Sequence, residues 1–134
     1  MGLVTTTITV TNQIDEELPK RGFIPREQIR SITIENVLVD TGCTHLCLPA
    51  NTILELGLPF QEEIEVKTVI EVKKTRLFKL AILTVEGRRD KFECIELPGG
   101  EDPLLGVIPL EQLKLQPDLI NERLVLLPKP EKDS

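Results

Sequence analysis

The sequence has no tryptophan and no tyrosine, and aromatic residues make up only 3% of its 134 residues. Proteins that bind single-stranded nucleic acid stack the bases on aromatic side chains and track the backbone with positive charge. Here 22 acidic residues outnumber 16 basic ones, and the net charge is −6. We therefore expect no nucleic acid among the partners.

Long apolar runs are absent as well, and none approaches the roughly 18 residues that a membrane-spanning helix needs. The N-terminus has no basic stretch followed by an apolar one, so we expect neither a secretory signal peptide nor a membrane partner. There are only three cysteines. An odd number without a secretion signal favours free thiols in a reducing compartment, so the expected localisation is cytoplasmic.

What the sequence does have is the size and composition of one soluble globular domain, with 40% apolar and 28% charged residues. A chain of this length can bury a core without disulfides or a metal. We expect the domain at residues 1–128 and a polar tail at residues 129–134.

The dominant local pattern is that of β-strands, because Val, Ile and Thr alternate with polar residues in several segments. Strands are expected at residues 3–12, 31–40, 44–48, 64–72, 77–85, 91–97 and 123–127. Two short helices are expected, one from Asn51 as N-cap to Gly57 and one after residues 104–106. The charged segment 13–30 contains two prolines and a glycine and is expected to be a surface loop. The fold class is therefore mostly β.

Chemistry is suggested by Asp40-Thr41-Gly42, which follows three apolar strand residues at 37–39. An acidic side chain carried inward needs donors, a partner or a raised pKa, because burying an unpaired carboxylate is costly. Gly42 would let the chain turn with a positive φ and expose backbone N–H groups, and Thr41 would supply a hydroxyl donor. Taken alone, Asp-Thr-Gly is also a common β-turn at the end of a strand.

Two segments carry a resemblance to aspartic peptidases of the retroviral, retropepsin-like type. Residues 37–49 (VLVDTGCTHLCLP) resemble their active-site strand and loop. Leu104-Leu105-Gly106 resembles their second signature, an apolar pair and a glycine that open the C-terminal helix. The resemblance spans residues 3–127. It implies a single-domain retropepsin-like acid-protease fold, with closed, barrel-like β-sheets, two short helices and one active-site motif per chain.

The resemblance also implies a homodimer, because such peptidases use two carboxylates and Asp-Thr-Gly occurs once here. A two-fold axis would bring Asp40 of each subunit together, while the chain is too short for a two-lobed enzyme. The implied function is an aspartic endopeptidase that cleaves peptides or proteins with an activated water, without cofactor or metal. As in such peptidases, the expected interface strands are residues 4–10 and 123–127.

Roles for individual residues follow only from the resemblance. The implied catalytic residues are Asp40, Thr41 and Gly42. The Thr41 hydroxyl would bond to the partner's loop, and Gly42 would present its backbone to the substrate. Leu105 and Gly106 would pack beneath the loop as structural support. The expected substrate-binding residues are Thr44, His45, Val72 and Lys74.

The expected flap, residues 69–78, departs from the family pattern because it contains no glycine. A stiff flap with a basic, solvated tip at Lys73, Lys74 and Arg76 would bind substrate weakly. A catalytically weak or inactive dimeric peptide-binding or scaffold module of the same fold therefore stays an alternative. Position 43 also departs, since a cysteine replaces the usual small Ala or Ser, and a thiol there could make activity sensitive to oxidation.

A third interpretation is a thiol-dependent or metal-dependent protein that uses Cys43, His45 and Cys47. On a strand, alternate residues lie about 6.6 Å apart, too far for one zinc ion to bind all three. The same geometry would separate Cys43 and Cys47 by about 13 Å, beyond the reach of a disulfide. We therefore expect no metal site and no such bridge, with His45 lining the cleft or its rim. Cys94 is expected to be a buried or edge thiol.

Overall fold

A computed structural model of the chain describes residues 2–22, 25–67, 70–97 and 101–129. These residues are mostly β, as expected, with three short helices rather than two. The strands are β1 (Thr5–Asn12), β2 (Ser31–Val39), β3 (Leu46–Pro49), β4 (Phe60–Lys67), β5 (Val72–Val85), β6 (Arg88–Leu97), β7 (Leu104–Leu105), β8 (Leu115–Asp118) and β9 (Arg123–Leu126). The helices are α1 (Gln13–Lys20), α2 (Ala50–Leu56) and α3 (Val107–Gln112), and η1 (Arg26–Gln28) is a 3-10 turn.

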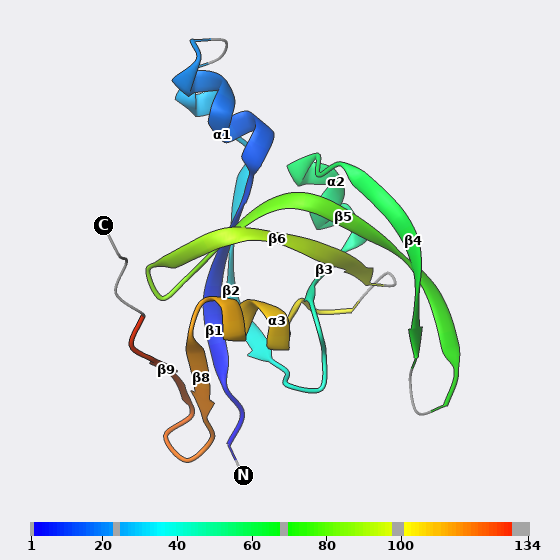
Figure 1. Cartoon of the computed structure of the whole chain (residues 1–134), viewed down its shortest axis with the longest axis vertical. Helices are drawn as coiled ribbons and strands as arrows, with labels where there is room; N and C mark the ends of the chain where they lie inside the picture. The colour runs from blue at the N-terminus through cyan, green and yellow to red at the C-terminus, as the bar shows by residue number, and fades with distance from the viewer. Residues whose placement is uncertain (1, 23–24, 68–69, 98–100, 130–134) are drawn as a thin grey trace.

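Seven strands form one sheet in the order β1-β2-β7-β3-β6-β5-β4 (Figure 1). β1 also pairs with β5, so the strand order returns to its start and only β4 lies outside this ring. β8 and β9 form a separate two-stranded sheet. β2 and β5 occupy both edges of β1 over residues 8–11, which leaves residues 8–10 of the expected interface strand, residues 4–10, without a free edge. The dimer interface itself stays a prediction.

The main core fills the space enclosed by these strands. Its fully buried side chains include Ile8, Leu46, Leu48, Leu83 and Leu105, each contributing about 1.5–3 kcal/mol relative to exposure. A second apolar cluster lies beside it. Its buried members are Cys47, Leu77, Ile95 and Leu97, and its partly buried members are Cys43, Ile64, Val66 and Leu104. The second cluster thus joins the β4–β5 hairpin to the segment that follows β2.

The surface loop expected at residues 13–30 is wrong, because α1 and η1 occupy most of it. The side chain of Asn12 caps α1 by accepting the N–H of Asp15 at 3.0 Å. Asp15 is buried and binds the guanidinium of Arg30 with both carboxylate oxygens, at 2.7 and 3.0 Å. These polar side chains stabilise the projecting arm (Figure 1), because no apolar side chain among its described residues, 13–22 and 25–30, is buried.

Both expected helices are present, but the N-cap residue predicted for the first of them is wrong. Asn51 lies inside α2 instead of capping it, since the helix follows Pro49. Gly57 ends α2 with φ +63°, a conformation that favours glycine. Leu110 and Leu113 bury the inner face of α3 and its end.

The strand expected at residues 64–72 is confirmed for residues 64–67, which lie in β4, but β4 ends at Lys67 and β5 begins only at Val72. β5 pairs with β4 over its first half and with β6 and β1 over its second. None of the helices in the described ranges is long and apolar enough to cross a membrane. The expected polar tail falls almost entirely outside the described residues.

Candidate active site

The segment between β2 and β3, residues 40–45, is called the Asp40 loop below. Its first residue is fixed by the sheet, because Asp40 N–H donates to the carbonyl of Leu105 at 2.9 Å. The preceding residue, Val39, donates to the carbonyl of Val4 at 2.9 Å. The apolar end of β2 therefore delivers Asp40 to one defined point at the edge of the core.

The carboxylate of Asp40 is half-buried and accepts the N–H of Gly42 at 2.9 Å. The carbonyl of Asp40 accepts the N–H of Cys43 at 3.0 Å, which closes a turn. The positive φ expected for Gly42 is wrong. Glycine is favoured for space instead, since a Cβ there would lie 3.1 Å from a carboxylate oxygen of Asp40.

The polar side chains that follow Asp40 point away from the core. Thr41 is exposed, and within the part of the chain that the structure describes its hydroxyl makes no hydrogen bond. Thr44 is also exposed, and its hydroxyl lies 2.7 Å from Nδ1 of His45. The loop therefore presents an unused hydroxyl beside the carboxylate.

Helix α3 holds the loop through main-chain groups. Three N–H groups at the start of α3 donate to three consecutive carbonyls of the loop. Gly106 N–H donates to the carbonyl of His45 at 3.1 Å. Val107 N–H donates to that of Cys43 and Ile108 N–H to that of Thr44, each at 2.8 Å. Gly106 lies so close that a Cβ would stand 2.5 Å from the His45 oxygen and 2.6 Å from that of Cys43. The preceding Leu105 is fully buried. Sequence reasoning placed residues 105–106 under the loop but gave no sign of these bonds.

The two cysteines of this region meet, contrary to expectation. Cys43 Sγ and Cys47 Sγ are 3.0 Å apart, because the chain turns through the loop and β3 begins only at Leu46. A hydrogen bond from Cys47 lowers the pKa of Cys43 to about 7. That same bond and burial raise the pKa of Cys47, while burial raises the pKa of Cys94 to about 12.

No group of three or more His, Cys, Asp or Glu is placed to hold a metal ion among residues 2–22, 25–67, 70–97 and 101–129. The buried position expected for Cys94 is confirmed, since it is 0% exposed.

The β4–β5 hairpin reaches the same end of the molecule as the Asp40 loop (Figure 1). Val72 and Lys74 lie exposed near its turn. The expected basic tip is wrong, because Lys73 and Lys74 lie within β5, opposite Val66 and Glu65. Residue 69 of the expected flap lies outside the described residues.

The base of this hairpin is tied to β6. Arg76 binds the carboxylate of Glu96 through Nη2 at 2.7 Å and Nε at 3.1 Å. The hydroxyl of Thr75 donates to the backbone carbonyl of Glu96 at 2.6 Å. The hairpin is therefore anchored at its base, while its far end is held by its own strand pairing.

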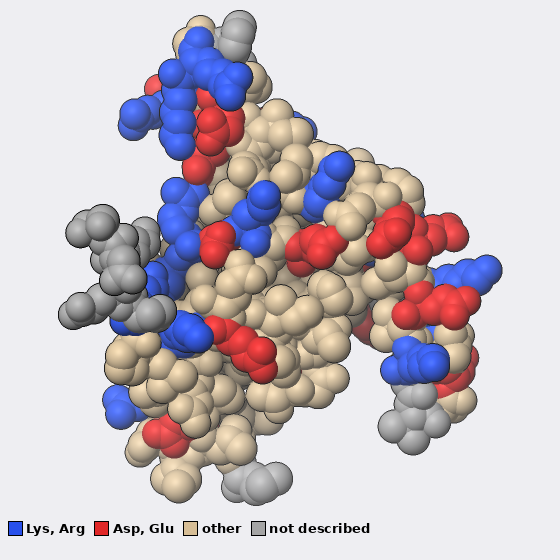
Figure 2. Space-filling model, viewed as in Figure 1, with Lys and Arg blue, Asp and Glu red and all other residues tan. Residues whose placement is uncertain are grey.

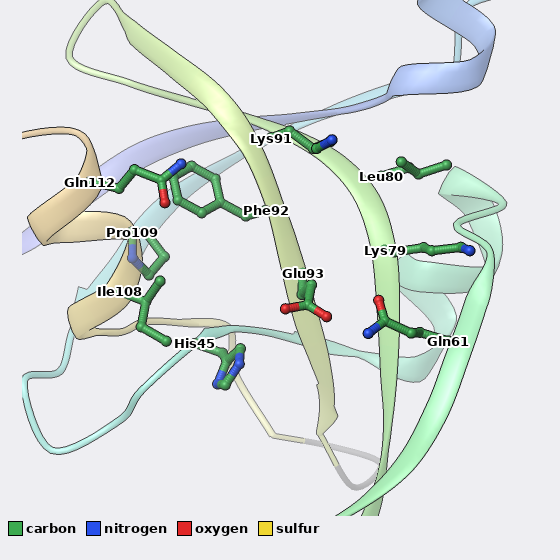
Figure 3. Close-up of a pocket in the computed structure, with 10 residues that line it drawn as sticks. All are labelled: His45, Gln61, Lys79, Leu80, Lys91, Phe92, Glu93, Ile108, Pro109 and Gln112. Atoms are coloured by element: carbon green, nitrogen blue, oxygen red, sulfur yellow. The ribbon is translucent and has the colours of Figure 1, made fainter.

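An open pocket of about 360 Å³ lies beside the loop, between α3 and the middle of β5 and β6 (Figure 3). His45 lines it together with Ile108 from α3 and Glu93 from β6. Residues 40–42 do not line it. Of the residues expected to bind substrate, His45 is thus next to a cavity that does not contain the carboxylate of Asp40.

Comparison with known protein families matches a span that includes these residues. A family model described as aspartyl protease matches residues 28–108. The matched span contains both the Asp40-Thr41-Gly42 segment and the Leu104-Leu105-Gly106 segment. A search of curated proteins found no match.

Proposed function

Because the chain belongs to the aspartyl protease family, of the retropepsin-like type, we propose that it hydrolyses peptide bonds as a homodimer with one Asp40 from each subunit. The observation that carries this proposal is the position of that carboxylate. It is half-buried, accepts one backbone N–H, and stands at the start of a loop whose backbone is fixed from below by α3.

The chemistry of the proposed pair follows from its charge. Two carboxylates about 3 Å apart repel by roughly 5 kcal/mol at an effective dielectric constant of 20. This corresponds to about four pKa units, so near neutral pH the pair carries one shared proton and titrates as a unit. The ionised carboxylate takes a proton from water, which attacks the scissile carbonyl. The protonated carboxyl donates to the developing oxyanion and then helps to protonate the leaving amine.

A second subunit is required because each chain supplies one Asp-Thr-Gly segment. The unused hydroxyl of Thr41 is suited to donate to the partner's loop, as the family resemblance implies. Asp40 has its own donor in Gly42, so a symmetric pair would have two backbone N–H groups, one on each carboxylate. Symmetry therefore completes a site that one chain only half supplies.

An apolar surface at the same end of the molecule supports association. Leu3 is 68% exposed, and Leu119 and Ile120 in the β8–β9 turn are 57% and 92% exposed. Gly2 packs against the Leu119 carbonyl so closely that no side chain would fit, which brings the N-terminal segment to this turn. Figure 2 shows few charged side chains at this lower end, compared with the α1 arm and the β4–β5 hairpin. We propose this surface as the dimer contact in place of β1.

The ring of paired strands supports the finer fold assignment, a retropepsin-like barrel closed by the β1–β5 pairing. In such a fold the β4–β5 hairpin is the flap that covers substrate. Its position at the same end as the Asp40 loop agrees with that role.

One observation favours a second candidate function, a dimeric peptide-binding module with little cleavage. Residues 60–85, which include the whole hairpin, contain no glycine. The strand register places Glu63 opposite Arg76 and Glu65 opposite Lys74, so charges of opposite sign face each other across the hairpin and favour its paired form. A hairpin that closes slowly over substrate would bind peptides and turn them over poorly.

The two functions are separated by Asp40→Asn in a peptide-library assay from about pH 3 to 8, the range over which a carboxylate pair titrates. A peptidase should lose at least about 100-fold in turnover, because the carboxylate is the general base. Asp90→Asn is the matched control, since Asp90 also accepts a backbone N–H, that of Lys91 at 2.8 Å, but lies outside the loop. Equal turnover of Asp40→Asn and wild type, with both folded by circular dichroism, would contradict the proposal.

A further inference from the structure

Two thiols meet where the loop that begins at Asp40 leads into β3. Cys43 Sγ and Cys47 Sγ are 3.0 Å apart, and both face the carbonyl oxygen of His45, at 3.5 and 3.6 Å. The bonds from α3 to the carbonyls of Cys43 and His45 hold the bend that brings the sulfurs together. Bonded sulfurs in a disulfide are about 2.05 Å apart, so closing the bond requires a movement of about 1 Å.

The environments of the two thiols differ in a way that assigns each a role. Cys47 is 3% exposed and belongs to the buried part of the second cluster, whereas Cys43 is half-buried at its edge. The hydrogen bond from Cys47 lowers the pKa of Cys43, with help from backbone hydrogen bonds at His45 and Thr44, although burial and the charge of Asp40 oppose this. Cys43 is thus the accessible thiol with thiolate character, and Cys47 is the protected neighbour.

We propose that Cys43 and Cys47 form a reactive dithiol, a modification site that small-molecule disulfides convert to an intrachain disulfide. Cys43 thiolate attacks one sulfur of the oxidant, which forms a mixed disulfide and releases one thiolate. Cys47 then loses its proton and attacks the Cys43 sulfur, which expels the second thiol of the oxidant. Two electrons pass from the dithiol to the oxidant, and a reducing thiol reverses both steps.

Closing this bond changes the loop that carries Asp40. Cys47 is held in β3 by pairing with β6, so Cys43 is the side that moves. The N–H of Cys43 donates to the carbonyl of Asp40, and its own carbonyl accepts from Val107. A shift of Cys43 therefore pulls on the turn that positions the carboxylate. This consequence, a lower peptidase turnover in the oxidised form, rests on the proposed function.

The test is incubation of the full chain with oxidised glutathione, followed by intact-mass measurement and peptide mapping. Wild type should lose two hydrogen atoms, keep no glutathione, and yield a linked peptide pair containing Cys43 and Cys47. Cys47→Ala should keep one glutathione on Cys43, because the resolving thiol is missing. Cys94→Ala is the matched control, a second buried cysteine changed in the same way, and it should behave as wild type.

The proposal is overturned if wild type stays reduced, keeps glutathione at Cys43, or links Cys94 instead. Turnover adds a second measurement. Oxidised wild type should cleave peptides about 10- to 100-fold more slowly than reduced wild type, because misplacing a catalytic group by about 1 Å costs this much. Dithiothreitol should restore the rate, and equal rates would contradict the effect on the loop. If the reduced protein cleaves nothing, the proposed function fails, while the mass result still decides the disulfide.

Discussion

The Asp40 loop and the α1 arm both leave the sheet, yet main-chain hydrogen bonds hold the loop whereas side chains hold the arm. The loop is held by main-chain hydrogen bonds, and three of them run from N–H groups at the start of α3 to consecutive carbonyls of the loop. The arm is held by side chains, through Asp15 with Arg30 and through Asn12, whose amide donates to the carbonyls of Leu56 and Gly57 at 2.8 and 3.2 Å.

This difference teaches which changes each region tolerates. A loop held by its backbone keeps its shape when its side chains vary. An arm held by polar side chains depends on their identity and on their charge. Backbone space should therefore matter most in the loop, and ionisation should matter most in the arm.

The largest expected effect is at Gly106. If main-chain bonds hold the loop, a side chain at this position should break them. Gly106→Ala should lower the free energy of unfolding by about 2–4 kcal/mol, because its Cβ would overlap two carbonyl oxygens of the loop. Chemical denaturation measures the change. Gly87→Ala is the comparison variant, since Gly87 has φ +77° and open space around it, so it should lose only about 1 kcal/mol through backbone strain. Equal losses would show that close packing under the loop is unimportant.

A smaller effect is expected in the arm from Asp15→Asn, which removes the charge but keeps the shape. It should lower the free energy of unfolding by about 1–2 kcal/mol near neutral pH, because it removes a charged hydrogen-bonded pair. The expected loss is kept small because the Arg30 side chain is half-exposed and solvent screens the pair. Urea unfolding and amide exchange of α1 measure the loss, which should be concentrated in the arm. Uniform loss across the sheet would contradict the idea that this pair serves the arm.

The same variant tests the pH dependence of the arm. The hydrogen bond from Arg30 holds the pKa of Asp15 below its ordinary value. A lowered folded-state pKa gives stability that is present above the unfolded-state pKa and is lost as the pH falls through the lower folded-state value. Wild-type stability should therefore decline below about pH 4, with a smaller decline in Asp15→Asn. Identical slopes for the two proteins would remove Asp15 from the account.

The smallest effect is expected at Thr44, whose exposed hydroxyl bonds only to His45. Thr44→Ala should change the free energy of unfolding by no more than about 0.5 kcal/mol, since the loop is held by its carbonyls. Thermal unfolding of this variant beside Gly106→Ala sharpens the comparison. A loss at Thr44 as large as that at Gly106 would show that side chains hold the loop.

The sequence predicted the features that depend on local pattern. The mostly β class, the β5–β6 hairpin and the turn at Gly57 follow from alternation and glycine, and the structure confirms them. Helix α1 was missed although its signals were present, because Asn12 followed by Asp15 and Glu16 is a typical helix start. The prolines and charges of residues 13–30 outweighed that signal.

Other features could not be predicted from local sequence patterns, because they depend on contacts between distant segments. The sulfur contact between Cys43 and Cys47 depends on where β3 begins, and that position is set by pairing with β6 and β7. The closure of β1 against β5 joins segments about seventy residues apart, so it is decided by packing of the whole sheet. The fit of Gly106 under the loop likewise needs both segments in place.

The central claim, that one Asp40 from each subunit is needed for cleavage, is tested most directly by mixing subunits. Wild type and Asp40→Asn chains, unfolded together in equal amounts and refolded, should assemble at random if the enzyme is a two-fold dimer. Specific activity should then fall to about one quarter of that of wild type alone at the same total concentration, because only dimers with two intact carboxylates cleave. A value of about one half, the simple dilution result, would mean that each chain acts alone and would contradict the account.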